Sequence, residues 1–246
     1  MLTALLADIH ANREALVACL AHAEASGAER YVFLGDYVGY GAEPGWAVDT
    51  VASYVQNGAR AILGNHDAAV FGSDADMNET ARAALIWTRE QLNGGQRDFL
   101  RGLPLTAEKD GRLFVHASAW DPSGWDYVTG PAAALRSFTA TEHRTTFCGH
   151  VHVPEVYHLS LTGKIAAFTP AAGTAIPLLP QRRWLAVIGS VGQPRDGIAA
   201  ASYAMLDDAR DTLTYMRVPY DVAGAAAKVR AAGLPMVLSL RLLQGR

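Results

Sequence analysis

The feature that most constrains the fold is an alternation of short apolar runs with longer segments of helical periodicity. The apolar runs cover residues 3–7, 31–34, 61–63, 113–115 and 145–148, and the helical segments cover 12–25, 46–56, 79–92 and 132–138. Strand and helix in alternation predict parallel strands joined by crossover helices. Runs that are apolar throughout are typical of strands with both sheet faces covered. We therefore expect an α/β fold.

The sequence pattern changes after residue 152, where helical segments no longer separate the apolar runs. Short apolar runs follow one another with turn residues between them, at 156–160, 164–168, 184–188, 202–206 and 212–218. This pattern predicts a second, largely antiparallel sheet, followed by a last helix over residues 222–232. The 246 residues contain no evident linker, so we expect a single domain over residues 1–246.

The charge balance argues against a dedicated nucleic-acid surface. Acidic residues outnumber basic ones by 24 to 21, giving a formal charge of −3, and there is no Lys/Arg cluster to neutralise a phosphate backbone. The charge balance is compatible with a small phosphorylated substrate, because bound cations can make the local charge of an acidic site positive.

Cysteine usage and hydropathy bear on the compartment. Cys19 falls in a helical segment and Cys148 in a strand-like run, so we expect both thiols to be buried and unpaired, as in a reducing cytoplasm. The sequence opens directly into an apolar run without a basic leader, so no signal peptide is expected. No run of about 18 apolar residues predicts a membrane span.

Each of the five early apolar runs ends in residue types that bind metal ions. The residues at these ends are Asp8, His10, Asp36, Asn65, His66, Asp67, His116, His150 and His152. In open α/β sheets, ligands bind outside the carboxyl ends of the strands. One histidine after a strand is usually structural, but five of the eight histidines lie in these positions. The set therefore predicts one shared polar pocket.

The spacing within the set fits metal binding. Asp8 and His10 are two residues apart, as are His150 and His152, which on extended backbone places both side chains of a pair on one side. Glycines 35, 64 and 149 directly precede candidate ligands, and glycine permits sharp turns and close approach. Carboxylate, imidazole and amide groups together suit Mn²⁺, Fe²⁺ or Zn²⁺. Carboxylates are too few for a calcium cage, and no thiolate set indicates structural zinc.

Several residues allow two interpretations. Asn12 is a candidate substrate ligand, but capping of the first helix is the more favoured interpretation. His22 and His143 are expected at the surface. The aromatic loop of residues 120–127 either lines the substrate pocket, with a base stacked on Trp120, Trp125 or Tyr127, or covers a sheet edge. The glycine-rich segment 189–197 either folds back near the site or forms a plain turn.

The strand-end residues resemble the motifs of the calcineurin-like metallophosphoesterase family. Its five motifs occur here in order: Asp-x-His at 8–10, Gly-Asp at 35–36, Gly-Asn-His-Asp at 64–67, a single His at 116 and Gly-His-x-His at 149–152. They span the first two-thirds of the chain, and their joint specificity is high. Residues 8–12, 35–41 and 189–195 further resemble the bacterial and archaeal branch of small phosphodiesterases related to diadenosine tetraphosphatase.

The resemblance implies a four-layer αββα sandwich of two mixed β-sheets flanked by helices, and a site for two divalent metal ions. One ion would be held by Asp8, His10, Asp36 and His152, and the other by Asp36, Asn65, His116 and His150. Asp36 would bridge them, since the cations of such sites lie about 3.5–4 Å apart.

The implied chemistry is hydrolysis of a small-molecule or nucleotide phosphate ester by a metal-activated water. His66 follows a ligand directly, and we expect it to protonate the leaving group, with Asp67 orienting its imidazole and favouring the protonated form. His66 could instead only stabilise the charged phosphate.

One departure from the family pattern concerns the phosphate. Many relatives carry Gly-Asp-x-x-Asp-Arg, but Gly39 and Tyr40 stand in place of the Asp-Arg pair. This weakens an alternative function as a protein serine/threonine phosphatase. We expect the phosphate contact to come from Asn12, Tyr40, Arg195 or backbone amides. A non-catalytic scaffold of the same fold is a further alternative, but such members are expected to lose His66 or several ligands, and all are present here.

Overall fold

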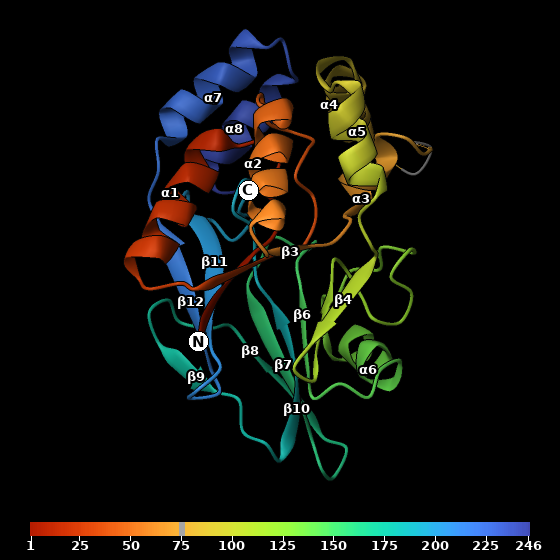
Figure 1. The fold of residues 1–246 in the computed structure, drawn as a ribbon, viewed down its shortest axis with the longest axis vertical. Coiled ribbons are helices and arrows are strands. Elements are labelled where there is room, and N and C mark those ends of the chain that lie inside the picture. The colour runs from red at the N-terminus through yellow and green to blue at the C-terminus, as the bar shows by residue number, and fades with distance from the viewer. Residues whose placement is uncertain (74–76) are drawn as a thin grey trace.

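The computed structural model describes residues 1–73 and 77–246 and contains two six-stranded β-sheets packed face to face (Figure 1). The first sheet has the order β3-β2-β1-β11-β12-β9 and the second β4-β5-β6-β10-β7-β8. The strands are β1 Leu2–Leu6, β2 Arg30–Phe33, β3 Arg60–Ala61, β4 Thr106–Lys109, β5 Arg112–Val115, β6 Thr145–Cys148, β7 Glu155–Ser160, β8 Ile165–Phe168, β9 Ala175–Pro177, β10 Arg182–Val187, β11 Ala201–Asp207 and β12 Thr212–Val218.

Helices cover the outer faces of both sheets (Figure 1). They are α1 Arg13–Ala25, α2 Pro44–Gln56, α3 Asn65–Ala69, α4 Glu79–Gln91, α5 Gly94–Arg101, α6 Pro131–Thr139, α7 Val222–Ala231 and α8 Met236–Gln244. Helix α1 contacts β11 and β12, and α2 contacts β3, whereas α6 contacts β7, β8 and β10. Helices α7 and α8 pack on each other, and α7 packs on α1. The architecture is the expected four-layer αββα sandwich.

The core reflects these layers, because alternate residues of a strand point to opposite faces. In β1, Ala4 and Leu6 belong to the cluster packed under α1 and α2. Leu5 belongs to the cluster between the two sheets, together with Phe114 and Phe147. A further cluster joins the second sheet to α6. Both faces of the early strands are thus buried, which explains why their sequences are apolar without alternation.

The expectation that the late strands form a second, antiparallel sheet of their own is wrong. β11 pairs antiparallel with β1, and β10 pairs parallel with β6, so the late strands complete both sheets. Short runs separated by turns show that strands exist, but they do not encode which edge each strand joins. The strand expected from the run at 61–63 is also longer than the one found, because β3 covers two residues.

Two other expectations can be compared with the structure. Cys19 and Cys148 are buried and unpaired, as expected. Within the described residues, no helix is long and apolar enough to cross a membrane.

Candidate metal centre

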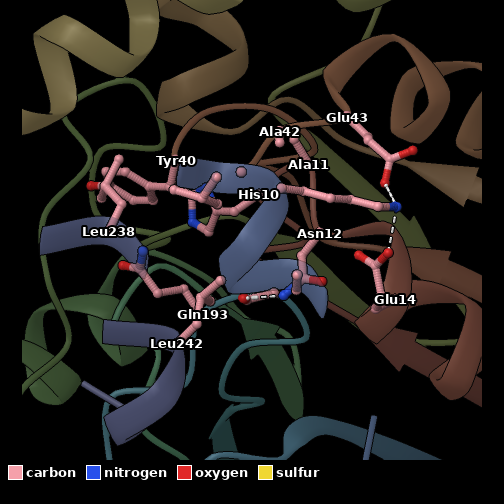
Figure 2. Close-up of a pocket in the computed structure, with 15 residues that line it drawn as sticks. His10, Ala11, Asn12, Glu14, Tyr40, Ala42, Glu43, Gln193, Leu238 and Leu242 are labelled. Atoms are coloured by element: carbon pink, nitrogen blue, oxygen red, sulfur yellow. Dashed lines mark hydrogen bonds and ion pairs between the residues drawn. The ribbon is translucent and has the colours of Figure 1, made fainter. Parts of the chain in front are cut away.

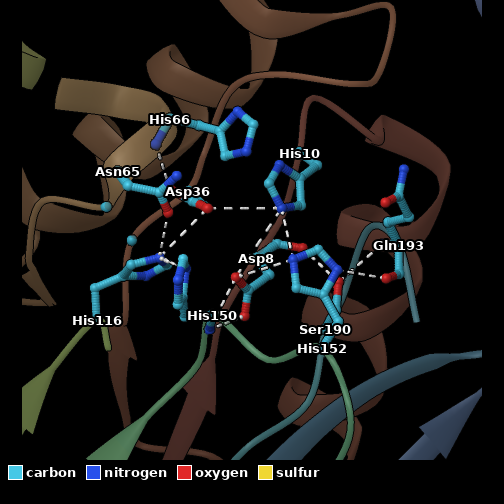
Figure 3. Close-up of polar contacts among 12 residues, drawn as sticks. Asp8, His10, Asp36, Asn65, His66, His116, His150, His152, Ser190 and Gln193 are labelled. Carbon is cyan, nitrogen blue, oxygen red and sulfur yellow. Dashed lines mark hydrogen bonds and ion pairs between the residues drawn. The ribbon is translucent and has the colours of Figure 1, made fainter. Parts of the chain in front are cut away.

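The candidate ligands meet where the loops after the early strands of both sheets come together (Figure 3). The loops after β1 and β2 approach from the first sheet, and those after β5 and β6 from the second. Hydrogen bonds hold these loops against one another: the amide of Asp8 donates to the Gly35 carbonyl (3.1 Å), and that of Gly149 to the His116 carbonyl (2.9 Å). The convergence expected from the strand ends is therefore present.

A first group consists of Asp8, His10 and His152, whose ligand atoms lie within 4.8 Å of one another. The Nε2 atoms of His10 and His152 are 3.0 Å apart. Asp8 Oδ1 lies 3.4 Å from His152 Nε2 and 4.0 Å from His10 Nε2. All three side chains are buried.

A second group surrounds His116. Its Nε2 atom lies 3.3 Å from Asp36 Oδ2, 3.1 Å from Asn65 Oδ1 and 3.2 Å from His150 Nδ1. Asp36 stands between the groups, because its Oδ2 atom is also 3.7 Å from His10 Nε2. Its other oxygen, Oδ1, accepts a hydrogen bond from the amide of His66 (2.8 Å). A single carboxylate oxygen, Oδ2, therefore faces both groups.

Backbone carbonyls fix the protonation of three of the imidazoles. The Nδ1–H of His10 donates to Val38 (3.0 Å), that of His116 to Leu34 (2.7 Å), and that of His152 to Gln193 (2.6 Å). A neutral imidazole that donates through Nδ1 carries its lone pair on Nε2. In all three residues Nε2 faces the carboxylates, which is the usual arrangement of metal-bound histidines.

The donor set fits divalent cations. The Nε2 lone pairs of His10 and His152 face each other at 3.0 Å, and two acceptors at this distance repel unless a cation lies against them. His150 offers Nδ1 to the second group, and its Nε2 is buried without a partner. Each group combines imidazole with carboxylate, and the second adds an amide oxygen, which suits borderline divalent metals.

The pKa values of the metal-free site show how closely the charges interact. Burial alone would raise the pKa of Asp36, but His116, His66 and His10 hold it well below its usual range. Burial alone would lower the pKa of His116, but the charge and hydrogen bond of Asp36 raise it to about 9. Burial and the neighbouring His116 lower the pKa of His150 to about 3. A proton on His116 thus balances Asp36 where a cation would otherwise do so.

The backbone of the site is strained. Ten non-glycine residues among the described ranges have positive φ, and eight of them lie at the site: Asp8, His10, Ala11, Asp36, Tyr40, Trp125, His150 and His152. The left-handed region costs L-residues about 1–2 kcal/mol each. Backbone strain of this kind clusters at functional sites, where surrounding contacts hold it in place.

Close approach explains the glycines before the ligands. A Cβ atom on Gly64 would lie 2.2 Å from Asp36 Oδ1, and one on Gly149 would lie 2.5 Å from Asp8 Oδ2. A Cβ atom on Gly35 would lie 2.7 Å from His116 Nδ1. A larger residue at any of these positions would displace a candidate ligand.

His66 lies beside the ligands, near the start of helix α3. Its ring is 5.0 Å from the ring of His10 and 4.5 Å from that of Tyr40. Its Nδ1 atom is buried and has no hydrogen-bond partner. Burial lowers the pKa of His66, and His152, His116 and Arg195 lower it further, although Asp36 opposes this. The imidazole is therefore neutral near pH 7 in the metal-free protein.

Asp67 differs from the expectation that it orients His66 and favours its protonated form. Its carboxylate accepts hydrogen bonds from the amides of Asp36 (2.8 Å), Tyr37 (2.9 Å) and Gly64 (3.0 Å). Burial and the nearby Asp36 raise the pKa of Asp67 to about 7. Asp67 therefore holds in place the loops that carry Asp36 and Asn65, because its carboxylate accepts hydrogen bonds from the backbone amides of these loops.

The three expected substrate-binding residues have different surroundings. Asn12 is the N-cap of α1, accepting from the Ala15 amide (3.1 Å), and its Nδ2 donates to the Gly192 carbonyl (2.8 Å). The capping interpretation is confirmed, and the buried amide has no free end for a substrate. Arg195 lies with its Cζ atom 5.7 Å from the centre of the Tyr40 ring. Tyr40 is buried with its ring 4.6 Å from that of His10.

The segment after β10 folds back onto the site, which the sequence left open. The amides of Val191 and Gly192 donate to the carbonyls of Ala7 and Asp8 (both 2.9 Å). Two residues here were not expected: Ser190, whose hydroxyl donates to the Asp8 carbonyl (2.8 Å), and Gln193. The sequence signals for them were the glycine-rich composition of the segment and the resemblance of residues 189–195 to the small-phosphodiesterase branch.

Gln193 connects a candidate ligand with Arg195. Its carbonyl accepts from His152, and its Oε1 atom accepts from Nε (3.3 Å) and Nη2 (3.0 Å) of Arg195. A pocket lies beside His10, lined by Asn12, Tyr40 and Gln193 and by Leu238 and Leu242 of α8 (Figure 2).

The aromatic loop lies against the candidate ligands. The Tyr127 ring stacks on that of His150, with centroids 4.1 Å apart and planes at 22°. The Trp125 ring meets that of His116 edge-on at 5.8 Å. This arrangement supports the pocket-lining interpretation for Trp125 and Tyr127. The Trp120 side chain is 56% exposed.

Sequence and structure comparisons agree on one family. A sequence model of the calcineurin-like phosphoesterase superfamily domain matches residues 1–211. The chain is 33% identical over 249 residues to an uncharacterised protein of Methanocaldococcus jannaschii, covering 99% of this chain and 98% of that protein. It is also similar to the crystal structure of a metallophosphoesterase from Sphaerobacter thermophilus, at 34% identity and a TM-score of 0.88, covering 100% of this chain and 99% of the other.

A more distant structure shows the fold alone. A hypothetical protein from Pyrococcus horikoshii is 20% identical, with a TM-score of 0.79 and coverage of 100% of this chain and 98% of the other. The full-length matches at higher identity and the domain match together establish that this chain belongs to the calcineurin-like phosphoesterase superfamily.

Proposed function

We propose that this member of the superfamily is a phosphodiesterase that hydrolyses a small-molecule or nucleotide phosphate ester with two divalent cations, Mn²⁺, Fe²⁺ or Zn²⁺. The observation that carries the proposal is the orientation of three imidazoles. His10, His116 and His152 each donate Nδ1–H to a carbonyl and aim Nε2 at a carboxylate. Imidazoles that donate Nδ1–H to a carbonyl and turn Nε2 toward carboxylates have the usual arrangement of metal-bound histidines.

The residues of the two groups would share the cations through Asp36. One cation would be held by Asp8, His10, Asp36 and His152, and the other by Asp36, Asn65, His116 and His150. Bound cations of this kind lower the pKa of water and neutralise charge on the phosphoryl oxygens. The protein fixes the ligands beforehand, through the carbonyls behind the imidazoles and through Asp67 behind the Asp36 loop.

His66 would give a proton to the leaving oxygen. Its ring is buried beside His10 and Tyr40, and its Nδ1 has no protein partner. Its lowered pKa leaves it neutral at rest, so it gains a proton when the negative charge of a bound phosphate ester raises that pKa. Proton donation of this kind contributes about 10²–10⁴-fold to turnover.

Arg195 would supply the phosphate contact that the missing Asp-Arg motif supplies in relatives. Tyr40 stands at the position of the motif arginine, and the Arg195 guanidinium lies over the Tyr40 ring. An arginine from a different loop thus lies beside the residue that occupies the motif position. A diester carries less negative charge than a monoester, so this single contact supports a preference for diesters.

Activity of the metal-reconstituted protein tests the proposal. We expect faster hydrolysis of the diester bis-p-nitrophenyl phosphate than of the monoester p-nitrophenyl phosphate. The same panel includes a cyclic nucleotide, as a second diester, and a dinucleoside polyphosphate, as an anhydride. Preference for the monoester would contradict the phosphodiesterase proposal. Absence of turnover with Mn²⁺, Fe²⁺ and Zn²⁺ would favour the non-catalytic scaffold.

Substitution of His66 tests its role separately. In His66→Ala, the metal content should hold while turnover falls by about 10²-fold or more. His22→Ala is a matched control, because His22 lies outside the site and bonds to the Tyr203 hydroxyl (2.7 Å). Unchanged turnover in His66→Ala would remove His66 from the mechanism.

A further inference from the structure

The loop between β5 and α6 places one exposed aromatic ring directly on a candidate metal ligand. Tyr127 stacks on His150 at 4.1 Å, yet 52% of the residue is exposed. Since His150 covers one face of the ring, the exposure belongs to the rest of the ring and to the hydroxyl. Trp120, on the same loop, is 56% exposed but has no ring contact with a site histidine among the described residues. Of these two exposed rings, Tyr127 is the one that presents an aromatic surface at the metal centre.

Tyr127 and His66 are associated with different ligand groups. His66 packs against His10 and Tyr40, at the first group. Tyr127 packs against His150, in the second group. If His66 protonates the leaving oxygen, the leaving substituent lies on the His66 side of the phosphorus. The other substituent stays on the phosphorus, and Tyr127 is the exposed aromatic ring at the second group that can receive it.

We infer that Tyr127 is a specificity-determining residue that stacks a planar aromatic group, an aryl ring or a nucleobase, on the ester substituent that remains attached to phosphorus. This inference rests on the proposed phosphodiesterase function and names its substrate class: diesters with an aromatic retained group. Aromatic stacking tolerates different rings, because every planar ring offers a π-face.

Three diesters with the same leaving group test the inference. Bis-p-nitrophenyl phosphate retains an aryl ring, thymidine 5′-monophosphate p-nitrophenyl ester retains a base, and p-nitrophenyl methyl phosphate retains only a methyl group. All three release p-nitrophenolate, so differences among variants report on the retained group. In Tyr127→Ala we expect kcat/KM to fall about tenfold or more for at least one aromatic substrate, and less than twofold for the methyl ester.

Two further variants separate recognition from support of His150. Tyr127→Phe keeps the ring and should keep the discrimination. Trp120→Ala removes an exposed aromatic residue of the same loop and should change none of the three substrates. Equal losses for all three esters in Tyr127→Ala, or no loss at all, would overturn the inference, because a merely structural role would affect every substrate alike.

Binding measurements decide the inference even if turnover is absent. Calorimetry with Mn²⁺-loaded protein should show bis-p-nitrophenyl phosphate binding about tenfold more tightly than the methyl ester, and Tyr127→Ala should abolish this difference. Absence of turnover with the affinity difference intact would contradict the proposed function alone. Equal affinities of the two esters for the wild-type protein would contradict the role of Tyr127.

Discussion

At the scale of single residues, the site depends on groups that hold the ligands in place without belonging to them. Gln193 accepts from His152 through its carbonyl and from Arg195 through its side chain. Gly39 leaves room for the ring of His66, since a Cβ atom there would lie 2.6 Å from Nδ1. Gln193 and Gly39 act through the residues that they contact, and a single substitution can remove each of these contacts separately.

Gly39→Ala should reduce both stability and turnover. Gly39 has φ of +84°, so alanine costs about 1–2 kcal/mol of unfolding free energy, and its methyl group displaces His66. Gly58→Ala is the matched control, because Gly58 has φ of +95° and a Cβ atom there would meet no other atom within 4 Å. Denaturant unfolding should show a loss in both variants, at least as large in Gly39→Ala as in Gly58→Ala. Turnover of bis-p-nitrophenyl phosphate should fall in Gly39→Ala alone, and equal turnover in the two would contradict the contact with His66.

Gln193→Ala should weaken substrate binding while leaving the metal content intact. The carbonyl that fixes His152 remains, but Arg195 loses its two hydrogen bonds. Loss of a bond to a charged group corresponds to about a tenfold fall in kcat/KM. Arg195→Gln should have a similar effect, and the double variant should lose little more, because the two residues act as one unit. Gln181→Ala, in an exposed turn, is the control. Additive losses in the double variant would disprove the coupling.

At the scale of elements, the ends of the secondary structure determine where the ligands point. Asp36 lies in the loop after β2, and His116 is the residue directly after β5. Asn65 is the first residue of α3. Helix α3 has only five residues, and isolated helices of this length are unstable in water. It forms because its N-terminus is anchored by Asp67 bonding to Gly64 and by the His66 amide bonding to Asp36.

Asn12→Ala should destabilise α1 and also impair activity. The cap contributes about 1 kcal/mol, and Nδ2 also tethers Gly192 in the segment that carries Gln193 and Arg195. Asn93→Ala removes the corresponding cap of α5 by breaking the bond to the Gln96 amide (2.9 Å). Both variants should lose about 1 kcal/mol or more in denaturant unfolding. A kcat/KM loss in Asn12→Ala should be absent from Asn93→Ala, and equal kinetics would show that the Gly192 tether has no effect.

At the scale of the whole molecule, the candidate metal centre joins the two sheets. Asp8 and Asp36 come from loops of the first sheet, and His116, His150 and His152 come from loops of the second. Across this boundary, the His150 amide donates to Asp8 Oδ2 (2.9 Å). Cations bound here would link both sheets, so their binding energy would add to the stability of the folded state.

Stabilisation by Mn²⁺ should therefore increase with pH. In the metal-free protein His116 has a pKa of about 9, so it is protonated at both pH 6 and pH 8, and a cation must displace that proton. Each pH unit below 9 weakens binding about tenfold through His116, and Asp67, with a pKa of about 7, also loses its proton in this range. Affinity should therefore be about 100-fold or more higher at pH 8 than at pH 6. His10 and His150 have lowered pKa values and are neutral at both.

Thermal unfolding with and without Mn²⁺ measures this effect. The rise in Tm caused by Mn²⁺ should be larger at pH 8 than at pH 6 for the wild-type protein. Asp36→Asn is the control, because it removes the charge that raises the His116 pKa and also the shared ligand. Its Tm should respond weakly to Mn²⁺ at both values. A wild-type response independent of pH would contradict the proton displacement.

The sequence by itself determined the early strands, the main helices and the set of candidate ligands. Residues 145–148 and 212–218 form strands with the bounds expected from their apolar runs. The glycines before the ligands were also informative, because close packing permits no Cβ atom there. These features are local: periodicity, turn residues and metal-binding side chains next to one another leave a signal in a short stretch of chain.

Only the tertiary structure decided which strands pair and which distant residues complete the site. Pairing of β11 with β1 and of β10 with β6 joins segments that lie far apart in the sequence, and no short pattern encodes such a choice. The same holds for Asp67, which has a carboxylate suited to orienting His66 but is bonded to backbone amides. Gln193 and Tyr127 reach the centre because their segments fold back on it. Residue type indicates what chemistry a side chain can perform, but the packing of distant segments determines what it contacts.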